Sequence, residues 1–298
     1  RLASLPDVPS MKELGYDVIT GVGGTGIVAV LKNGSGPTVM LRTELDALPV
    51  VEATGFAFAS KVRTKDDAGN DVGVMHACGH DLHMASWMGT ARIMAGSRKT
   101  WSGTLVLIGQ PAEETGAGAN AMIKDGLLTR FPRPDFALAV HDDARRPAGE
   151  IAFHAGPALS NADAVTVHIY GKGGHGARPE TTIDPIVIAA RTVLALQTIV
   201  SREMNPFDPA VITVGSIHGG TKNNIIPDEV VLQLTVRSFT KPVRDHLLSA
   251  ITRIANAEAA AAGAPKPPLI ERIVTAQALV NDPALTQQAF ADVYFRTG

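Results

Sequence analysis

The stretch Leu105-Val-Leu-Ile-Gly-Gln-Pro-Ala-Glu-Glu114 joins an apolar run to a pair of carboxylates. An almost continuous aliphatic run of this length is typical of a strand buried on both faces of a sheet. Three similar runs lie in the same half of the chain, at Ile27–Leu31, Thr38–Leu41 and Phe136–Val140. Between them, the apolar spacing at Leu82–Ala95 and Ala119–Leu128 favours helices. We therefore predict an α/β layer with a mostly parallel central sheet flanked by helices.

The second half of the chain has a different order of elements, which changes near Asn161. Strands are expected at 164–170, 210–217, 230–237 and 269–273, and helices at 183–199 and 243–261. The order β-α-β-β-α-β is that of a ferredoxin-like α+β domain. A further helix is expected after Asn281-Asp282. We predict a first domain over 1–160, an inserted domain over 161–273, and a return to the first domain over 274–298.

The amino-acid composition is that of an ordinary globular protein, and it does not indicate a strongly charged binding partner. The chain has 298 residues, 45% hydrophobic and 19% charged, so we expect two domains with real cores. A net charge of −2 gives no general attraction to nucleic acid or anionic membranes, and apolar stretches such as Thr104–Ile108 are too short to span a bilayer. The single cysteine excludes an internal disulfide and leaves cytosol and periplasm equally open. The beginning, Arg1-Leu-Ala-Ser-Leu-Pro6, is unlike a signal peptide and lacks an initiator Met, so we expect an upstream segment that was cleaved or left out.

Chemically active side chains follow the predicted strands of the first domain. Glu44 and Asp46 follow one strand, Glu113 and Glu114 follow a second, and His141 ends a third. Ligands of open α/β sheets gather at the carboxyl ends of strands. We therefore expect these residues to lie at one edge of the sheet.

A cluster of metal-binding residue types occurs in His76-Ala-Cys-Gly-His-Asp81. Cys78 and His80 flank a glycine, so both side chains can reach one ion, and a helix beginning just after them is expected to favour the thiolate. A buried structural cysteine with surface histidines is the alternative. His83, one turn further on, is expected to support the site or face solvent rather than bind the ion.

Glu113 and Glu114 can divide two tasks, one coordinating a metal and the other transferring a proton. A solvated acidic loop is the alternative, but the position of the two glutamates directly after an apolar strand makes this alternative weaker. Asp46 is expected to orient a ligand or stabilise the site, with a surface ion pair to Arg42 as the alternative. For Glu44 both roles stay open.

The remaining motifs are less specific. Gly21-Val-Gly-Gly-Thr-Gly26 has the spacing of a dinucleotide-binding loop, but a strand rather than a helix is expected after it, so we interpret it as a bend in a meander. His175 lies in the glycine-rich loop 171–179 and is either simply exposed or able to stabilise an oxyanion. Asn224 and Arg237 either bind a substrate carboxylate or are a turn residue and a solvated strand end.

Five motifs in order resemble the family of metal-dependent aminoacylases, hippurate hydrolases and auxin-amino-acid conjugate hydrolases. They cover most of the chain: Arg42-Thr-Glu-Leu-Asp-Ala-Leu-Pro49, His76-Ala-Cys-Gly-His-Asp81, Gln110-Pro-Ala-Glu-Glu114, Gly171-Lys-Gly-Gly-His175 and Asn224-Ile-Ile-Pro-Asp228. The resemblance implies a zinc-peptidase-like catalytic domain and a ferredoxin-like lid that also forms a homodimer. It also implies two divalent ions per subunit, bound by Cys78, His80, Glu114 and His141.

In the same family resemblance, Glu113 is the general base that activates a metal-held water and then protonates the leaving amine. His175 reaches the partner subunit's active site and stabilises the tetrahedral intermediate. Two departures stand out. Asp142 and Asp143 follow His141 where relatives have a small or apolar residue, and relatives continue past this chain with a stretch that supplies a final histidine ligand.

We therefore predict metal-dependent hydrolysis of the amide bond of N-acyl amino acids or related conjugates. Zinc, manganese, cobalt and nickel all suit the ligand set. A dipeptidase or carboxypeptidase with the same machinery is the near alternative, and a cysteine hydrolase using Cys78 is a more distant one. A truncated, catalytically impaired metal-binding dimer is the alternative outside the enzymes.

Overall fold

The computed structural model describes residues 9–66 and 68–297, so the start of the chain, with the expectations about a signal peptide and an upstream segment, lies outside the described residues. The chain divides into two compact units, 1–150 and 151–298. Each unit is described by itself below. The three-segment division into catalytic and inserted domains stays a prediction.

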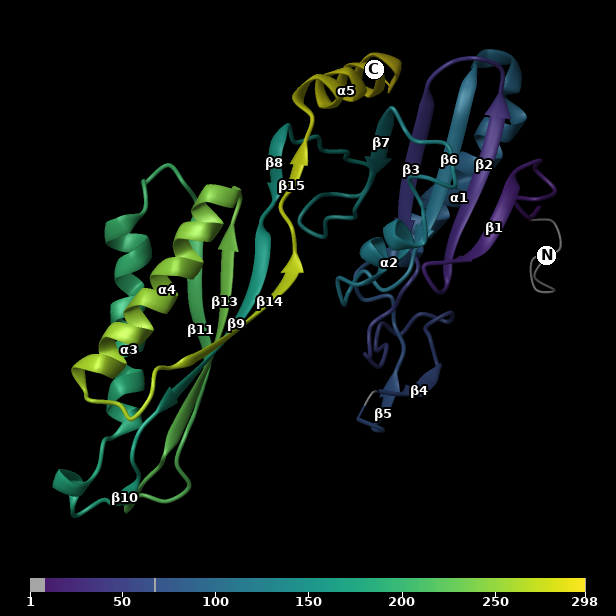
Figure 1. The fold of residues 1–298 in the computed structure, drawn as a ribbon. Helices are drawn as coiled ribbons and strands as arrows, with labels where there is room; N and C mark the ends of the chain where they lie inside the picture. The colour runs from purple at the N-terminus through teal and green to yellow at the C-terminus, as the bar shows by residue number, and fades with distance from the viewer. Residues whose placement is uncertain (1–8, 67, 298) are drawn as a thin grey trace. The chain divides into compact units, whose positions relative to one another are not determined.

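The first unit is built on a five-stranded sheet in the order β1-β2-β6-β3-β7 (Figure 1). Its elements are β1 (Asp17–Val22), β2 (Gly26–Asn33), β3 (Thr38–Glu44), β4 (Arg63–Lys65), β5 (Asp71–Gly73), α1 (His80–Gly96), the 3-10 turn η1 (Arg98–Thr100), β6 (Gly103–Gln110), α2 (Gly118–Lys124) and β7 (Phe136–Ala139). All four predicted strands and both predicted helices are present, with bounds that differ by a few residues.

The prediction of a mostly parallel sheet is wrong, because the sheet is mixed. β3 pairs in parallel with β6 and β7, whereas β2 pairs antiparallel with β1 and β6. A tight connection accounts for the β1–β2 pair, because Gly23 and Gly24 turn β1 directly into β2, whereas a parallel pair needs a long crossover. The glycines of 21–26 therefore form a hairpin bend, as interpreted from the sequence. The three strands that are mutually parallel are those that precede the candidate site residues.

Both faces of the central strands are covered, one by α1 and the other by α2. Ala29 and Leu107 pack with Trp87 of α1, and Val28 and Ile108 pack with Met122 of the segment around α2. Alternate residues of β2 and β6 thus face opposite helices, which explains their continuous apolar runs. The edge strand β7 is different, since all four of its residues are exposed. The expectation that this strand is buried on both faces is therefore wrong. Helices α1 and α2 contact β3 and β6, and β7 has β3 as its sheet neighbour.

The second unit contains a four-stranded sheet in the order β11-β13-β9-β14. Its elements are β8 (Gly156–Leu159), β9 (Asn161–Tyr170), β10 (Gly174–His175), the 3-10 turn η2 (Pro179–Thr181), α3 (Pro185–Thr198), the π-helical extension η3 (Ile199–Glu203), β11 (Ala210–His218), β12 (Ile225–Ile226), β13 (Glu229–Ser238), α4 (Lys241–Ala261), β14 (Leu269–Ala276), β15 (Leu279–Asn281) and α5 (Pro283–Thr297). All neighbouring strands of the four-stranded sheet are antiparallel. This order and pairing are those of the ferredoxin-like arrangement predicted from the sequence.

Helices α3 and α4 lie together on one face of this sheet (Figure 1). The core between the two layers includes Val167 of β9, Leu232 of β13, Leu196 of α3 and Ile251 of α4. By length and composition, the helical stretch 185–203 is long and apolar enough to cross a membrane. The expectation that the apolar stretches are too short to span a bilayer did not take this stretch into account. Ile188, Leu196 and Ile199 of this stretch belong to the core, as expected for a helix that covers a sheet.

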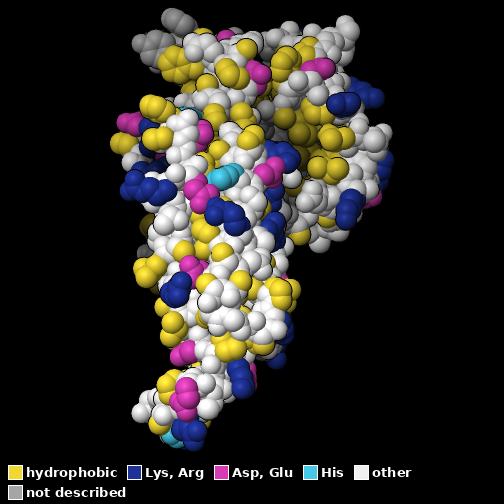
Figure 2. Space-filling view, turned by 60° about the vertical axis from the view of Figure 1, so that its left-hand side comes forward, with side chains coloured by type: hydrophobic (Ala, Val, Ile, Leu, Met, Phe, Trp, Pro, Cys, Tyr) yellow, Lys and Arg dark blue, Asp and Glu magenta, His cyan; other side chains and the backbone are white. Residues whose placement is uncertain are grey.

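Basic and acidic side chains are interspersed on the surface shown in Figure 2. This agrees with the near balance of 27 basic and 29 acidic residues.

Candidate metal centre

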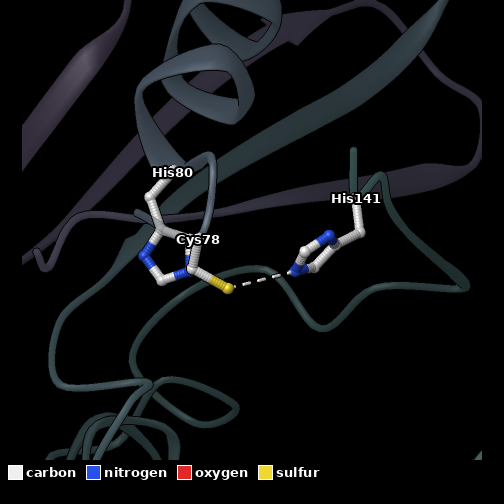
Figure 3. Close-up of side chains that lie close together, drawn as sticks. All are labelled: Cys78, His80 and His141. Carbon is white, nitrogen blue, oxygen red and sulfur yellow. Dashed lines mark hydrogen bonds between the residues drawn. The ribbon is translucent and has the colours of Figure 1, made fainter. Parts of the chain in front are cut away.

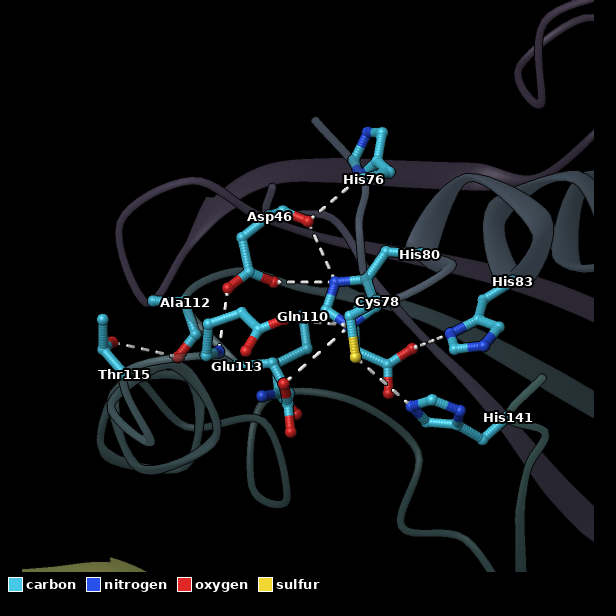
Figure 4. Close-up of polar contacts among 12 residues, drawn as sticks. Asp46, His76, Cys78, His80, His83, Gln110, Ala112, Glu113, Thr115 and His141 are labelled. Atoms are coloured by element: carbon cyan, nitrogen blue, oxygen red, sulfur yellow. Dashed lines mark hydrogen bonds and ion pairs between the residues drawn. The ribbon is translucent and has the colours of Figure 1, made fainter. Parts of the chain in front are cut away.

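Three loops meet at the carboxyl edge of the parallel strands (Figure 4). Asp46 follows β3, Glu113 and Glu114 follow β6, and His141 follows β7. Because β3, β6 and β7 are mutually parallel, their ends lie at the same edge of the sheet. Cys78 comes to this edge from the loop before α1, and His80 from the first residue of α1. The structure thus brings together residues that the sequence separates by up to 95 positions.

Cys78 and His141 point toward each other (Figure 3), with 3.6 Å between Sγ of Cys78 and Nε2 of His141. These two atoms also lie within 4.8 Å of a ring nitrogen of His80. A thiol and two imidazoles at such distances can hold one divalent ion.

His80 is the buried member of the site, with its side chain 1% exposed. Its Nδ1 lies 2.9 Å from the main-chain oxygen of Asp46 and 3.3 Å from the carboxylate Oδ1. Its Nε2 has no hydrogen-bond partner among the described residues, although carboxylate oxygens of Glu113 and Glu114 lie 3.8 and 3.9 Å away. A buried ring nitrogen without a partner is costly unless something else binds it.

The turn after β6 aims the two glutamates. Ala112 has φ 50°, a left-handed conformation that is unusual outside glycine and that redirects the chain just before Glu113. The main-chain N–H of Glu114 donates to Oδ2 of Asp46 at 3.0 Å, which ties this turn to the loop after β3. Gly118 closes the turn, because a Cβ there would lie 1.5 Å from the carbonyl oxygen of Pro111.

Gly79 is required for the loop that carries Cys78 and His80. It has φ 74°, which non-glycine residues rarely adopt, and it is followed at once by α1. A Cβ at this position would lie 2.2 Å from Oδ1 of Asp142. The absence of a side chain therefore lets the Asp142 carboxylate lie directly against the loop.

The expectation that the helix start favours the Cys78 thiolate is wrong. Burial, the nearby carboxylate of Glu114 and the further carboxylates of Glu113 and Asp142 raise the pKa of the thiol to about 11. These carboxylates outweigh the amino end of α1, because each opposes a second negative charge nearby. A thiol with a raised pKa is a poor nucleophile, which disfavours the cysteine hydrolase.

The same surroundings suit a cation. An ion among these carboxylates would reverse their effect on Cys78 and would give Nε2 of His80 a partner. Thiol, imidazole and carboxylate donors form four overlapping groups here, and the described residues fit a centre for divalent metal.

The sequence suggested Asp46 and His83 as residues that support the ligands, but it left the role of Glu44 open and gave no supporting role to Asp142. His83 is 3% exposed and its Nδ1 lies 2.9 Å from Oε2 of Glu44, so a solvent role for His83 is excluded. Oε1 of Glu44 also pairs with Nη1 of Arg42 at 2.5 Å. Glu44 therefore contacts both a histidine of the site and the arginine on its own strand. Asp46 contacts His80 and Glu114 rather than Arg42. Asp142 contacts both His83 and His141, and its position directly after His141 was the only signal available.

Two of the three candidate residues in the second unit lie together. β10 pairs with β12, which places His175 opposite Ile225, and the N–H of Gly176 donates to the carbonyl of Asn224 at 2.8 Å. Arg237 lies near the other end of β13, opposite Val211 and Ala162. The structure therefore brings His175 and Asn224 together but not Arg237.

The mixed α/β layer thus carries a cluster of candidate metal ligands at the ends of its parallel strands. The chain belongs to peptidase family M20/M25/M40, whose family model matches residues 40–289. This confirms the resemblance found in the five motifs.

Named relatives differ in what they act on. N-acetyl-L-cysteine deacetylase of Bacillus subtilis is 40% identical over 238 residues, which are 80% of this chain and 54% of that protein. Thermostable carboxypeptidase 2 of Saccharolobus solfataricus is 40% identical over 249 residues, 82% of this chain and 60% of that protein. The chain thus spans little more than half the length of these relatives. The solved structure of the YXEP protein of Bacillus subtilis, described as a dinuclear metal-binding peptidase, is 29% identical with a TM-score of 0.76 and covers 95% of this chain and 71% of that one.

Proposed function

We propose that the protein hydrolyses the amide bond of N-acyl amino acids or related conjugates in a metal-dependent reaction. The observation that carries the proposal is the buried, unpartnered Nε2 of His80, which faces two adjacent glutamates beside the Cys78–His141 pair. The similarity to an N-acetyl-L-cysteine deacetylase supports this substrate class.

Cys78, His80, Glu114 and His141 are the residues that would hold the metal. The similarity to the dinuclear metal-binding YXEP protein supports two ions per subunit, and zinc, manganese, cobalt and nickel all suit the donors. When bound, such ions lower the pKa of a coordinated water and polarise the scissile carbonyl.

Glu113 would move the proton. Its side chain is 40% exposed, so it can meet a substrate, and its Oε2 lies 3.8 Å from Nε2 of His80. Glu114 is less exposed, at 24%, and its main chain is fixed by Asp46. This difference favours Glu113 as the base that accepts a proton from water and returns it to the leaving amine.

The second unit would act as a lid and as the homodimer contact. His175 and Asn224 lie together and would bind the substrate's oxyanion and carboxylate, with Arg237 as a further carboxylate ligand. The sequence resemblance supports these roles.

The test compares Glu113→Gln with Glu114→Gln. Glu113→Gln should retain bound metal while turnover of acetyl- and benzoyl-amino acids falls by about 10²–10⁴-fold, the usual loss on removing a general base. Glu114→Gln should lose both metal and turnover. Retained turnover in Glu113→Gln would remove Glu113 from the role of base.

A carboxypeptidase or dipeptidase reaction is the second candidate, favoured by the 40% identity to a thermostable carboxypeptidase. The ratio of kcat/KM for acyl-amino acids to that for matched dipeptides decides between them. Metal binding without turnover of either class would identify an impaired metal-binding protein.

A further inference from the structure

Asp142 holds His141 in the same way as Asp46 holds His80. Nδ1 of His141 lies 2.7 Å from the main-chain oxygen of Asp142 and 3.2 Å from its Oδ1. The corresponding distances from Nδ1 of His80 to Asp46 are 2.9 and 3.3 Å. In both pairs one aspartate offers a carbonyl and a carboxylate oxygen to the same ring nitrogen.

This arrangement fixes the chemical state of the outward-facing nitrogen. A hydrogen on Nδ1 is favoured by two acceptor oxygens, which leaves the Nε2 lone pair free to bind a metal. For His80 that lone pair faces Glu113 and Glu114, and for His141 it faces Sγ of Cys78. Equivalent aspartates thus direct the Nε2 atoms of the two imidazoles toward the centre.

Asp142 is itself anchored to the interior of the first unit. Its main-chain N–H donates to Nε2 of His83 at 3.0 Å. The other nitrogen of His83 contacts Glu44, which is 4% exposed and paired with Arg42 of β3. A buried series of polar contacts therefore runs from β3 to the loop after β7.

Gly79 completes the anchor, because only a residue without a side chain leaves room for the Asp142 carboxylate against the metal-binding loop. His141 is exposed, with 55% of its side chain accessible, so it lacks the packing that fixes His80. Its orientation depends on Asp142 more than that of His80 depends on Asp46.

We propose that Asp142 is a positioning residue of the metal centre, which fixes the tautomer and direction of His141 and is held in turn by His83 and Glu44. The inference rests on the metal centre of the proposed function. It concerns metal affinity rather than turnover, so the two can fail separately.

The test measures zinc affinity by competition with a chromogenic chelator. Loss of a carboxylate that orients a metal-binding histidine costs about 10–100-fold in metal affinity, and Asp142→Ala should fall in that range. Asp142→Asn should lose less, about 3–10-fold, because its amide oxygen still accepts from Nδ1 but without the charge.

Asp143 provides matched controls. Its carboxylate pairs with Arg145 and lies next to Asp142 in the chain, so Asp143→Ala and Asp143→Asn remove the same charge near the site. Both should change zinc affinity by less than about 2-fold, in keeping with an exposed ion pair. If Asp142→Ala does not fold, the isosteric comparison of Asp142→Asn with Asp143→Asn decides alone.

Equal affinities in the Asp142 and Asp143 variants would overturn the proposal, as would an Asp142→Asn loss as large as that of Asp142→Ala. Wild-type protein that binds no zinc would instead overturn the metal centre itself. A third result is possible: the wild type binds zinc without hydrolysing amides, and the zinc affinities of the variants follow the expected order. This result would overturn the proposed function and leave the role of Asp142 intact.

Discussion

Replacing Gly79 by Ala tests the geometry of the metal-binding loop in the absence of any ion. The substitution puts a Cβ into a residue with φ 74°, at a point 2.2 Å from Oδ1 of Asp142. Both the backbone and the Asp142 carboxylate must respond. Gly89, in the middle of α1, is the matched control, since a Cβ there meets nothing within 4 Å.

The expected cost has two parts. A left-handed conformation costs a non-glycine residue about 1–2 kcal/mol. Moving the carboxylate gives up its contact with Nδ1 of His141, worth about 0.5–1.5 kcal/mol. The free energy of unfolding should therefore fall by about 1.5–3.5 kcal/mol. In Gly89→Ala it should rise by about 0.5–1 kcal/mol, because alanine is the better helix former.

The assay is urea unfolding of chelator-treated protein followed by tryptophan fluorescence. The only two tryptophans, Trp87 and Trp101, both lie in the first unit, so the signal reports the unit that contains the loop. A double-mutant cycle with Asp142→Ala separates the two parts of the cost. In that background Gly79→Ala should cost only about 1–2 kcal/mol, the backbone part.

Two results would refute this reasoning. Unchanged stability of Gly79→Ala would show that the loop does not need a glycine. The same cost with and without Asp142→Ala would show that the carboxylate does not lie against position 79.

Two further predictions concern the second unit. A hydrogen bond to Glu229, which has the larger effect, and one to Glu271 raise the pKa of His168 above its ordinary 6.5. These hydrogen bonds therefore stabilise the fold fully below pH 6.5, and this stabilisation is lost as pH rises through the raised pKa. Calorimetric unfolding at about pH 5.5 and about pH 8.5 should show this loss in the wild type and a smaller one in His168→Gln, and an equal loss in both would contradict it. The Asp163 carboxylate is 1% exposed and is bound by two guanidinium nitrogens of Arg244 at 2.6 and 2.8 Å. Arg244→Ala leaves this buried carboxylate without its partner, so the free energy of unfolding, measured by circular dichroism, should fall by about 3–5 kcal/mol. Arg253→Ala, which removes the exposed partner of Glu203 from the same helix, should cost only about 0–1 kcal/mol, and similar losses in both variants would be inconsistent with a buried pair.

The sequence predicted the convergence of the site because strand ends can be located from apolar runs. Once β3, β6 and β7 are parallel, the residues that follow them must lie at one edge of the sheet. The ferredoxin-like order followed from the same kind of pattern. The mixed character of the sheet did not, because β1 lacks a continuous apolar run and its hairpin was treated only as a bend.

Side-chain partners were harder to predict than strand ends. Burial raises the pKa of Cys78 most, followed by the carboxylates of Glu114, Glu113 and Asp142, which approach from two other loops. Helix position alone could not show that these charges outweigh the helix end. The pairing of Asp142 with His83 likewise requires the left-handed Gly79, a conformation that residue identity permits but does not specify.

The central claim is that Cys78, His80, Glu114 and His141 together bind a divalent cation. Titration of chelator-treated protein with cobalt(II), followed by absorption spectroscopy, tests it directly, because a thiolate ligand produces a charge-transfer band in the near ultraviolet. We expect saturable binding with that band in the wild type and its loss in Cys78→Ser. No binding, or an identical spectrum in Cys78→Ser, would contradict it.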